Sequence, residues 1–469
     1  MEKVLYLMTE ISLLLGCLFL FLQKFLTDVS IKGYIKSTKI IVLISACFSI
    51  LFYNKSVFPM YLEVSSFTSL FYFLSCLMVF FWLSLSVKWF VSEDLEPFSF
   101  CLLSLVALFC FSLIIKATDL KVLFVGLSML SFVNYKMLKF SQENEEFHNS
   151  SKRYIITSML FILLMLISFF VLGKDSSNYV KIAETIGLSD FRISAFMFVS
   201  IIFFILFLLG VAPLHCCFAD AVAPAVLPVA SYFCLVPLNA LFACFIKLNT
   251  IVFASVKIEL SLIYMCFGIF SLIVGAIGAN ASRNLRKIFA YSSIYNLGML
   301  ILLLSPFTIL NLCGGFIYLQ IYILALFGIY TCFYSFKSNG IYVANLNMIN
   351  GIAKVRPFIS AVMLFFMISL MGIAPFPGFV GQVFVLENFA TNKNYIIIFI
   401  TLFTLLILMA AYLQIIRSMY FNKKDIEFNR SDYGIYVYLL VSIVCIITLI
   451  LKPDFLLYDM AAIFNLVLV

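Results

Sequence analysis

Two short stretches, GVAPLHCCFAD at residues 210–220 and MGIAPFPGFVGQ at residues 371–382, decide the fold of this chain. Each one interrupts a long apolar run with glycine and proline. Proline removes a helical hydrogen bond, and in lipid the freed backbone groups need protein partners or a wet cavity. The stretches therefore predict two broken membrane helices. The breaking residues are Gly210, Pro213, Pro375, Pro377 and Gly378.

The composition places the rest of the chain in lipid as well. The 469 residues are 64% hydrophobic and only 11% charged, whereas a soluble domain carries roughly 25% charged residues. A spanning helix needs roughly 20 apolar residues, and the runs here are continuous rather than alternating as in a membrane barrel. We expect an all-α polytopic membrane protein of about 14 helices. The predicted spans are 4–23, 38–53, 66–87, 98–115, 119–135, 154–172, 193–212, 224–246, 258–278, 288–306, 312–334, 357–386, 395–416 and 434–451.

The two breaks fall in the seventh and twelfth spans, so these segments run in opposite directions across the membrane. Helices 4–8 and 9–13 then form two inverted five-helix repeats, each with its broken helix fourth. Interrupted helices in corresponding positions point to a translocation path, although either break alone also suits a packing kink. The predicted segments are an N-terminal three-helix part at 1–97, repeats at 98–250 and 251–420, and helix 14 with its tail at 421–469.

Charge and cysteine usage exclude other classes of protein. The 13 cysteines show no CxxC pair and there are two histidines, so we predict neither a metal centre nor a cluster. The net charge of +8 lies in short loops, which argues against nucleic acid. Most Lys and Arg residues occupy odd-numbered loops, which the positive-inside rule places on the matrix or cytoplasmic side, with both termini opposite.

Three runs then resemble a known family. GVAPLHCCFADAVAPAVLP at 210–228, LRKIFAYSSIYNLGMLI at 285–301 and SLMGIAPFPGFVGQVFVL at 369–386 are similar to signatures of the antiporter-like membrane-arm subunits of respiratory complex I, the proton-pumping NADH:quinone oxidoreductase. The helix total, the short tail and YLQIIRSMYF at 412–421 favour subunit 2 over subunits 4 and 5.

The resemblance implies the antiporter-like fold and a non-redox subunit of NADH:ubiquinone reductase, with no catalytic residue on this chain. NADH, FMN, iron–sulfur clusters and quinone are expected on partner subunits. The expected partners are the neighbours resembling subunits 4 and 4L, accessory subunits and anionic lipids such as cardiolipin. The excess of residues with AT-rich codons favours the mitochondrial inner membrane, with both termini on the intermembrane-space side.

The departures from the family concern its proton axis. The family carries a glutamate in helix five and lysines in helices seven, eight and twelve, and these positions align here with Ser128, Leu208, Leu238 or Asn239, and Gln382. None of these side chains titrates near neutral pH. A charge at mid-membrane costs at least roughly 2.5–3.5 kcal/mol and is normally kept only for function. The substitutions argue against proton translocation through this chain.

A competing view is that protons use water wires and shifted titratable groups such as His215, Asp220, Lys116 or Lys136. His215 and Asp220 fall where the family has its histidine and aspartate, and His215 titrates near pH 6.5 when unperturbed. The alternatives are that His215 serves the broken backbone and that Asp220 caps helix eight. Two rival functions stay open: a cation/proton antiporter of the same superfamily, and an unrelated multi-pass membrane scaffold.

Overall fold

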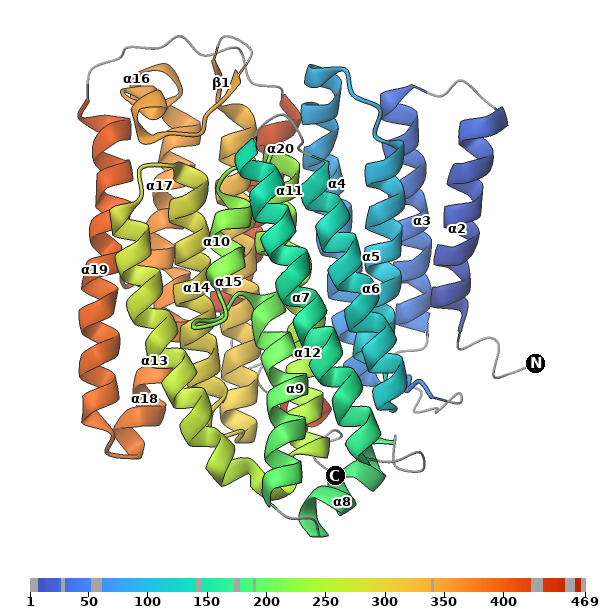
Figure 1. Cartoon of the computed structure of the whole chain (residues 1–469). Coiled ribbons are helices and arrows are strands. Elements are labelled where there is room, and N and C mark those ends of the chain that lie inside the picture. The colour runs from blue at the N-terminus through green and yellow to red at the C-terminus, as the bar shows by residue number, and fades with distance from the viewer. Residues whose placement is uncertain are drawn as a thin grey trace. The chain divides into compact units, whose positions relative to one another are not determined.

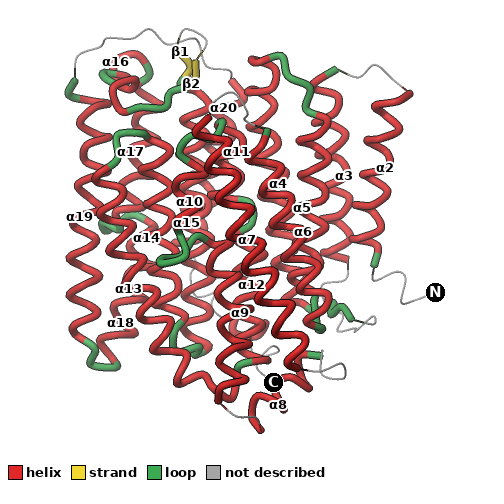
Figure 2. Tube along the Cα trace, viewed as in Figure 1, coloured by secondary structure: helices red, strands yellow, loops and turns green. Residues whose placement is uncertain are grey.

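The structure, a computed structural model of the chain, is helical almost throughout (Figures 1 and 2). In its described part the strands are β1 (Lys337–Ser338) and β2 (Ile341–Tyr342), which pair antiparallel. The described residues are 7–26, 30–51, 61–140, 145–172, 178–188, 191–338, 341–422, 433–451 and 460–464.

The described residues contain eleven helices long and apolar enough to cross a membrane. Three shorter apolar helices, Val199–Leu209, Pro357–Met371 and Gly434–Leu449, complete the series. Together they follow the 14 predicted spans in order, which confirms the predicted fold class. The second span is the least accurate prediction, because the helix covers Ile31–Leu51 rather than 38–53.

The chain divides into two compact units, which are interleaved in sequence. Unit 1 includes Met1–Leu209 and Val236–Val256. Within it α12 is fully buried and packs against α4, α5 and α9. The elements of unit 1 are α2 (Met8–Leu26), α3 (Ile31–Leu51), α4 (Ser66–Glu93), α5 (Phe98–Lys116), α6 (Leu120–Lys139), α7 (Glu145–Leu172), α8 (Tyr179–Leu188), α9 (Phe191–Leu209), α12 (Leu238–Lys247), the π-helical turn η1 (Leu248–Val252) and the 3-10 turn η2 (Ala254–Val256).

Unit 2 includes Gly210–Leu235 and Lys257–Leu466. Its closest helix pair is α13 with α14, where a Cβ added to Gly275 would lie 2.7 Å from the backbone nitrogen of Tyr295. Small residues of this kind allow membrane helices to approach closely. The elements are α10 (Cys216–Val222), α11 (Leu227–Leu235), α13 (Lys257–Ala281), α14 (Leu285–Leu304), α15 (Ile309–Ser335), η3 (Leu346–Ile349), α16 (Ile352–Val355), α17 (Pro357–Met371), α18 (Pro377–Thr391), α19 (Tyr395–Tyr420) and α20 (Tyr433–Leu451).

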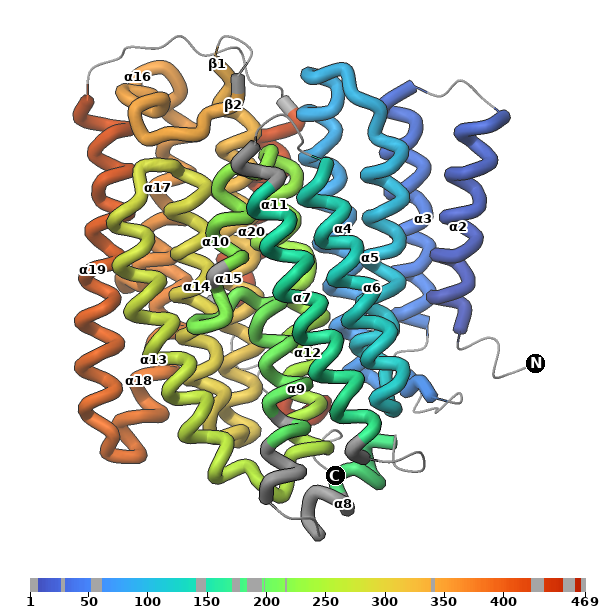
Figure 3. The backbone as a smooth tube through the Cα atoms, in the orientation of Figure 1, coloured from blue at the N-terminus to red at the C-terminus, as the bar shows by residue number. Residues whose placement is uncertain are grey.

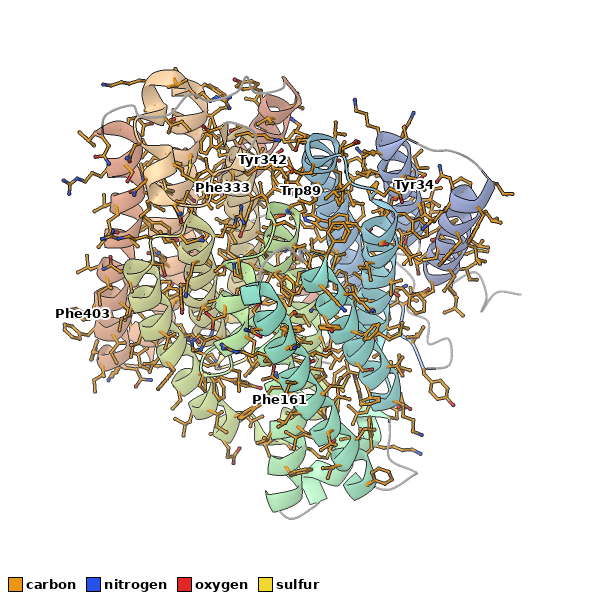
Figure 4. The ribbon with its side chains drawn as sticks, turned by 45° about the horizontal axis from the view of Figure 1, so that its top comes forward. Tyr34, Trp89, Phe161, Phe333, Tyr342 and Phe403 are labelled. Atoms are coloured by element: carbon orange, nitrogen blue, oxygen red, sulfur yellow. The ribbon has the colours of Figure 1, made fainter. Side chains whose placement is uncertain are left out.

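The outer face of α19 is covered by exposed apolar side chains. Ile396, Phe399, Phe403 and Leu406 are more than half exposed, and they recur at helical spacing. Phe403 projects away from the helices of its unit (Figure 4). A stripe of large apolar side chains on a charge-poor helix suits lipid rather than water.

Short polar connections set the helix starts. Asp119 caps α6 by accepting from the Lys121 N–H at 2.8 Å, and Asn284 caps α14 by accepting from the N–H groups of Arg286 and Lys287. Such side chains satisfy donors that have no intrahelical partner. The local sequence is therefore enough to explain where these helices begin.

Both predicted breaks are present. In the first, α9 ends at Leu209 and α10 begins at Cys216. In the second, α17 ends at Met371 and α18 begins at Pro377, and the two segments follow one another from the upper to the lower part of the view (Figure 3). Cis peptide bonds precede Pro213 and Pro375.

The structure adds a third interruption, which the sequence analysis did not predict. The eighth span divides at Pro237 into α11 and α12, and its end continues into η1. Proline cannot donate the hydrogen bond that a continuous helix needs there.

Two further expectations have no structural outcome. The tail expected after helix 14, within the segment 421–469, lies largely outside the described residues. The division into repeats at 98–250 and 251–420 differs from the two compact units, and it stays a prediction.

Candidate functional site

The first break is satisfied by protein atoms within unit 2. The N–H of Ala212 donates to Ser271 Oγ on α13 at 2.9 Å, and the N–H of Phe218 donates to the His215 carbonyl at 2.8 Å. Gly210 has φ +78°, and a Cβ there would lie 2.6 Å from the Phe218 ring. Glycine is needed both for this backbone conformation and for this close approach.

The second break is arranged similarly around Gly372, which has φ +67° and closes α17 by donating to the Ser369 carbonyl at 2.9 Å. The N–H of Gly378, at the start of α18, donates to Ser369 Oγ at 3.2 Å. The buried amide of Gln382 lies so close that a Cβ on Gly372 would be 2.0 Å from it. Gln382 therefore packs directly against the interrupted backbone.

The two proton-path candidates lie on or beside α10. His215 is the N-cap residue of this helix, and its half-buried side chain lies beside the backbone of Pro213. Asp220 lies within α10, with Oδ1 3.6 Å from the Lys287 ammonium of α14, and both side chains are more than one-third exposed. Such an exposed pair contributes roughly 0–1 kcal/mol.

Arg286, next to Lys287 at the start of α14, makes a shorter contact to the backbone of this region. Arg286 donates from Nη1 to the Ala225 carbonyl at 2.6 Å, joining the start of α14 to the chain between α10 and α11. Arg286 thereby provides a hydrogen-bond donor for a backbone carbonyl near the first break.

The positions that align with the family's axis are uncharged, and four of the five are buried. Leu208 is 5% exposed, Leu238 2%, Asn239 0% and Gln382 5%. Ser128 is half-buried and donates to the Val125 carbonyl of its own helix at 3.1 Å. Four of these five residues belong to unit 1, and Gln382 belongs to unit 2.

Unit 2 contains a neutral polar network that sequence reasoning missed. The Tyr412 hydroxyl bonds Ser292, and Asn296 Nδ2 donates to the Ser292 carbonyl at 2.8 Å. The Tyr318 hydroxyl donates to Asn296 Oδ1 at 2.8 Å, and the Tyr318 ring lies against Gly381, next to Gln382. The available signal was the i, i+4 pair Ser292 and Asn296 on one helix face. These groups orient water but carry no charge near neutral pH.

The described residues of unit 1 form two buried ion pairs that sequence reasoning also missed. Lys116 Nζ lies 2.7 Å from Glu10 Oε1, with side chains 4% and 8% exposed. Lys247 Nζ lies 2.6 Å from Glu63 Oε2, with side chains 3% and 17% exposed. The predicted eighth span stopped at 246, so Lys247 was counted as a loop residue. The structure corrects this, because Lys247 ends α12 and is buried.

The comparisons with known proteins agree with this geometry. The family described as NADH:quinone oxidoreductase/Mrp antiporter, TM, matches residues 117–408. The chain belongs to this NADH:quinone oxidoreductase/Mrp antiporter family. A relative named NADH-quinone oxidoreductase subunit N from Pelagibacter ubique is 26% identical over 357 residues, covering 76% of this chain and 75% of the relative. Its namesake from Rhodospirillum rubrum is 26% identical over 345 residues, covering 73% and 71%.

Solved structures share the fold of this NADH:quinone oxidoreductase/Mrp antiporter family member. A chain of respiratory complex I from Thermus thermophilus superposes with TM-score 0.81 at 20% identity, covering 97% of this chain and 99% of that one. A chain of the Mrp complex from Dietzia superposes with TM-score 0.85 at 14% identity, covering 100% and 97%. The membrane-bound, multi-pass character follows from the family and from the helices together.

Proposed function

We propose that this chain is the subunit N type component of the membrane arm of NADH:quinone oxidoreductase, and that it does not relay protons along the family's central axis. One observation carries the second part. Ser128, Leu208, Leu238, Asn239 and Gln382 are all uncharged, and four of them are buried. The first part is supported by relatives named subunit N, whose alignments cover about three-quarters of this chain.

The physical argument concerns what a proton needs in a low-dielectric interior. It needs either groups that take it up and release it or an unbroken chain of water. Leu208 and Leu238 offer neither, and both are almost fully buried. An ionisable residue in a membrane helix is costly, so apolar replacement is favourable where proton transfer is not required. The axis therefore has the composition of a packed core.

The breaks in helices seven and twelve fit the same conclusion. Their backbone groups bond to Ser271 and Ser369. The fold thus keeps the interrupted helices of a carrier while closing them with hydroxyl groups that do not titrate.

We place the redox chemistry on partner subunits, so that NADH, FMN, iron–sulfur clusters and quinone bind elsewhere. The partners on this proposal are membrane-arm subunits of the subunit 4 and 4L type, accessory subunits and anionic lipids such as cardiolipin. The relatives are bacterial, and codon-biased composition is the ground for proposing the mitochondrial inner membrane. The positive-inside rule supports termini on the intermembrane-space side.

The assembly is tested by detergent extraction and a native gel. Co-migration of the chain with a large NADH-oxidising band is expected. Recovery in a small assembly without NADH oxidation would instead favour a cation/proton antiporter, which the shared fold of the Mrp chain also allows.

Proton transfer is tested by counting protons moved per NADH in sealed vesicles. His215→Ala and Asp220→Asn should leave this ratio unchanged, because the axis lacks the groups that would connect them. Each variant is compared with wild type at equal amounts of assembled enzyme, and an uncoupler defines zero. A lower ratio in intact assemblies would refute the non-relaying part of the proposal while leaving subunit membership in place.

A further inference from the structure

The two buried ion pairs of unit 1 lie where three chain segments meet at one end of the unit. The Glu63 N–H donates to the Lys116 carbonyl at 2.7 Å, and the Thr118 N–H donates to the Tyr61 carbonyl at 3.1 Å. The Tyr179 N–H donates in turn to the Thr118 carbonyl at 3.0 Å. This ladder joins the start of α4, the end of α5 and the start of α8. It fixes Glu63 beside the end of α5.

All of these segments are even-numbered connections between membrane helices. The ladder includes the connection from α5 to α6 and the residues that precede α4, and Lys247 ends α12 just before η1. α8, which packs against η1, lies at the lower edge of the view beyond the membrane helices of its unit (Figure 1). The paired charges therefore lie near one aqueous face, on the even-loop side.

The first pair is fully partnered. Lys116 Nζ contacts Glu10 Oε1 at 2.7 Å and Thr9 Oγ1 at 2.6 Å, and it lies 5.0 Å from the centre of the Tyr72 ring. The Thr9 hydroxyl donates to Glu10 Oε2 at 2.6 Å. Every oxygen of this carboxylate has a donor and the site is closed to solvent. Glu10 and Lys116 thus act as a positioning pair that joins α2 to α5.

The second pair is different. The Lys247 ammonium has three N–H donors, and beyond the Glu63 carboxylate no described residue accepts a hydrogen bond from it. Lys247 is buried, whereas the Glu63 side chain is 17% exposed. One end of this pair therefore contacts water and the other end is enclosed. π-helical turns such as η1, which begins directly after Lys247, often mark functional sites.

The position of Lys247 on its helix gives a further indication. Lys247 follows Leu238 by nine residues and Asn239 by eight, so it lies about 12–14 Å from them along the axis of α12, roughly 180° and 80° around the helix. The helix thus carries its lysine about two turns beyond both candidate axis positions, at the end that approaches water. A buried ion pair is not in general more stable than apolar residues of the same volume. What sets this pair apart from Glu10–Lys116 is that the Glu63 carboxylate keeps some exposure to solvent while its lysine is enclosed.

We propose that Glu63 and Lys247 form a proton-exchange site, open to the aqueous phase on the even-loop side and separate from the family's central axis. In the exchange, the Lys247 ammonium gives its proton to the Glu63 carboxylate, leaving a neutral amine and a carboxylic acid. The acid then releases the proton to water and becomes a carboxylate again. The reverse sequence reloads the amine. Because this site communicates with one aqueous phase, it moves no net proton across the membrane and goes beyond the proposed function.

Other titratable groups surround the pair in the described part of unit 1. Tyr179 of α8 interacts electrostatically with Glu63, with Asp119 at the start of α6 and with the Cys244 thiol of α12, and Cys244 interacts with Lys247. Of the other cations on these segments, Lys116 is already paired with Glu10, and Lys121 and Lys181 are exposed to solvent. Lys247 is therefore the cation that controls Glu63.

The test uses an apolar carbodiimide, which adds to protonated carboxyl groups within membranes, on the assembled complex over a range of pH. Adducts are located by mass spectrometry. In wild type, Glu63 should be labelled increasingly as the pH falls, while Glu10 stays unlabelled at the same pH values. A Glu63 that remains unlabelled wherever the complex stays assembled would overturn the proposal, because a purely structural pair keeps its carboxylate ionised.

Matched variants separate the two pairs. In Lys247→Met, labelling of Glu63 should extend to higher pH, because the cation that favours the carboxylate is gone. In Lys116→Met, the labelling profile of Glu63 should stay close to that of wild type in the complex that assembles. An unchanged Glu63 profile in Lys247→Met would refute the coupling on which the site depends.

The proton count per NADH in Glu63→Gln distinguishes this proposal from the proposed function. An unchanged proton count in Glu63→Gln, together with the expected labelling of Glu63 in the wild-type complex, supports both proposals. A reduced count, with Glu63 labelled as expected in wild type, keeps the exchange site and refutes the claim that the chain relays no protons.

Discussion

Removing the positive charge of the Glu10–Lys116 pair should severely impair unit 1. Lys116→Met leaves the Glu10 carboxylate 8% exposed, with the Thr9 hydroxyl as its remaining partner on the lysine side. Breaking a buried ion pair by removing one partner costs about 3–5 kcal/mol. That is roughly two to three and a half decades in a folding equilibrium, and a large share of the roughly 5–15 kcal/mol that stabilises a typical protein.

The assay is the amount of chain in the assembled complex on a native gel, together with thermal inactivation of NADH oxidation. The single variant should accumulate at a small fraction of the wild-type level. The double variant Glu10→Met with Lys116→Met should recover most of it, since apolar replacement of both partners is often neutral or stabilising. A single variant that assembles like wild type, or a double variant as poor as the single one, would refute the assignment of a structural pair.

Three further predictions concern the breaks and the exposed pair. Gly372→Ala should destabilise the second break by at least about 1–2 kcal/mol for its left-handed backbone, with an added clash against Gln382; lower accumulation in membranes checks this, and wild-type levels would contradict it. Ser271→Ala should cost about 1–3 kcal/mol by leaving the Ala212 N–H unpaired, seen as a lower temperature of thermal inactivation, with Ser271→Thr as the control that retains the hydroxyl. Asp220→Asn should change stability by less than about 1 kcal/mol, because both side chains of its pair with Lys287 are more than one-third exposed; a large loss of assembled complex would show that this pair does more than its geometry indicates.

Much of the architecture could be predicted from local sequence. The apolar runs predicted 14 spans in order, and the glycine–proline stretches predicted both broken helices. This was possible because lipid imposes length and backbone hydrogen bonding on each segment separately. The division of helix eight at Pro237 was missed, because a single proline in a membrane helix is compatible with a continuous kinked helix.

The candidate site was predicted less well. Aligning motifs with the family predicted which axis positions lack charge, and this assignment stays a prediction; Leu208, Leu238, Asn239 and Gln382 are buried. The buried ion pairs of unit 1 were missed, because Lys116 and Lys247 stand at the ends of apolar runs. At such positions a lysine normally extends to the interface.

Sequence alone determined the membrane class, the order of the apolar segments and the two broken helices. Each of these depends on the residue types along one segment, and those are visible without neighbours. Tertiary structure decided which hydroxyl closes each break and which carboxylate faces each buried lysine. Glu10 and Lys116 are more than a hundred positions apart in the chain, and Glu63 lies far from Lys247 as well. Pairing over such separations is set by helix packing and backbone bridges, since local propensity carries no information about distant partners.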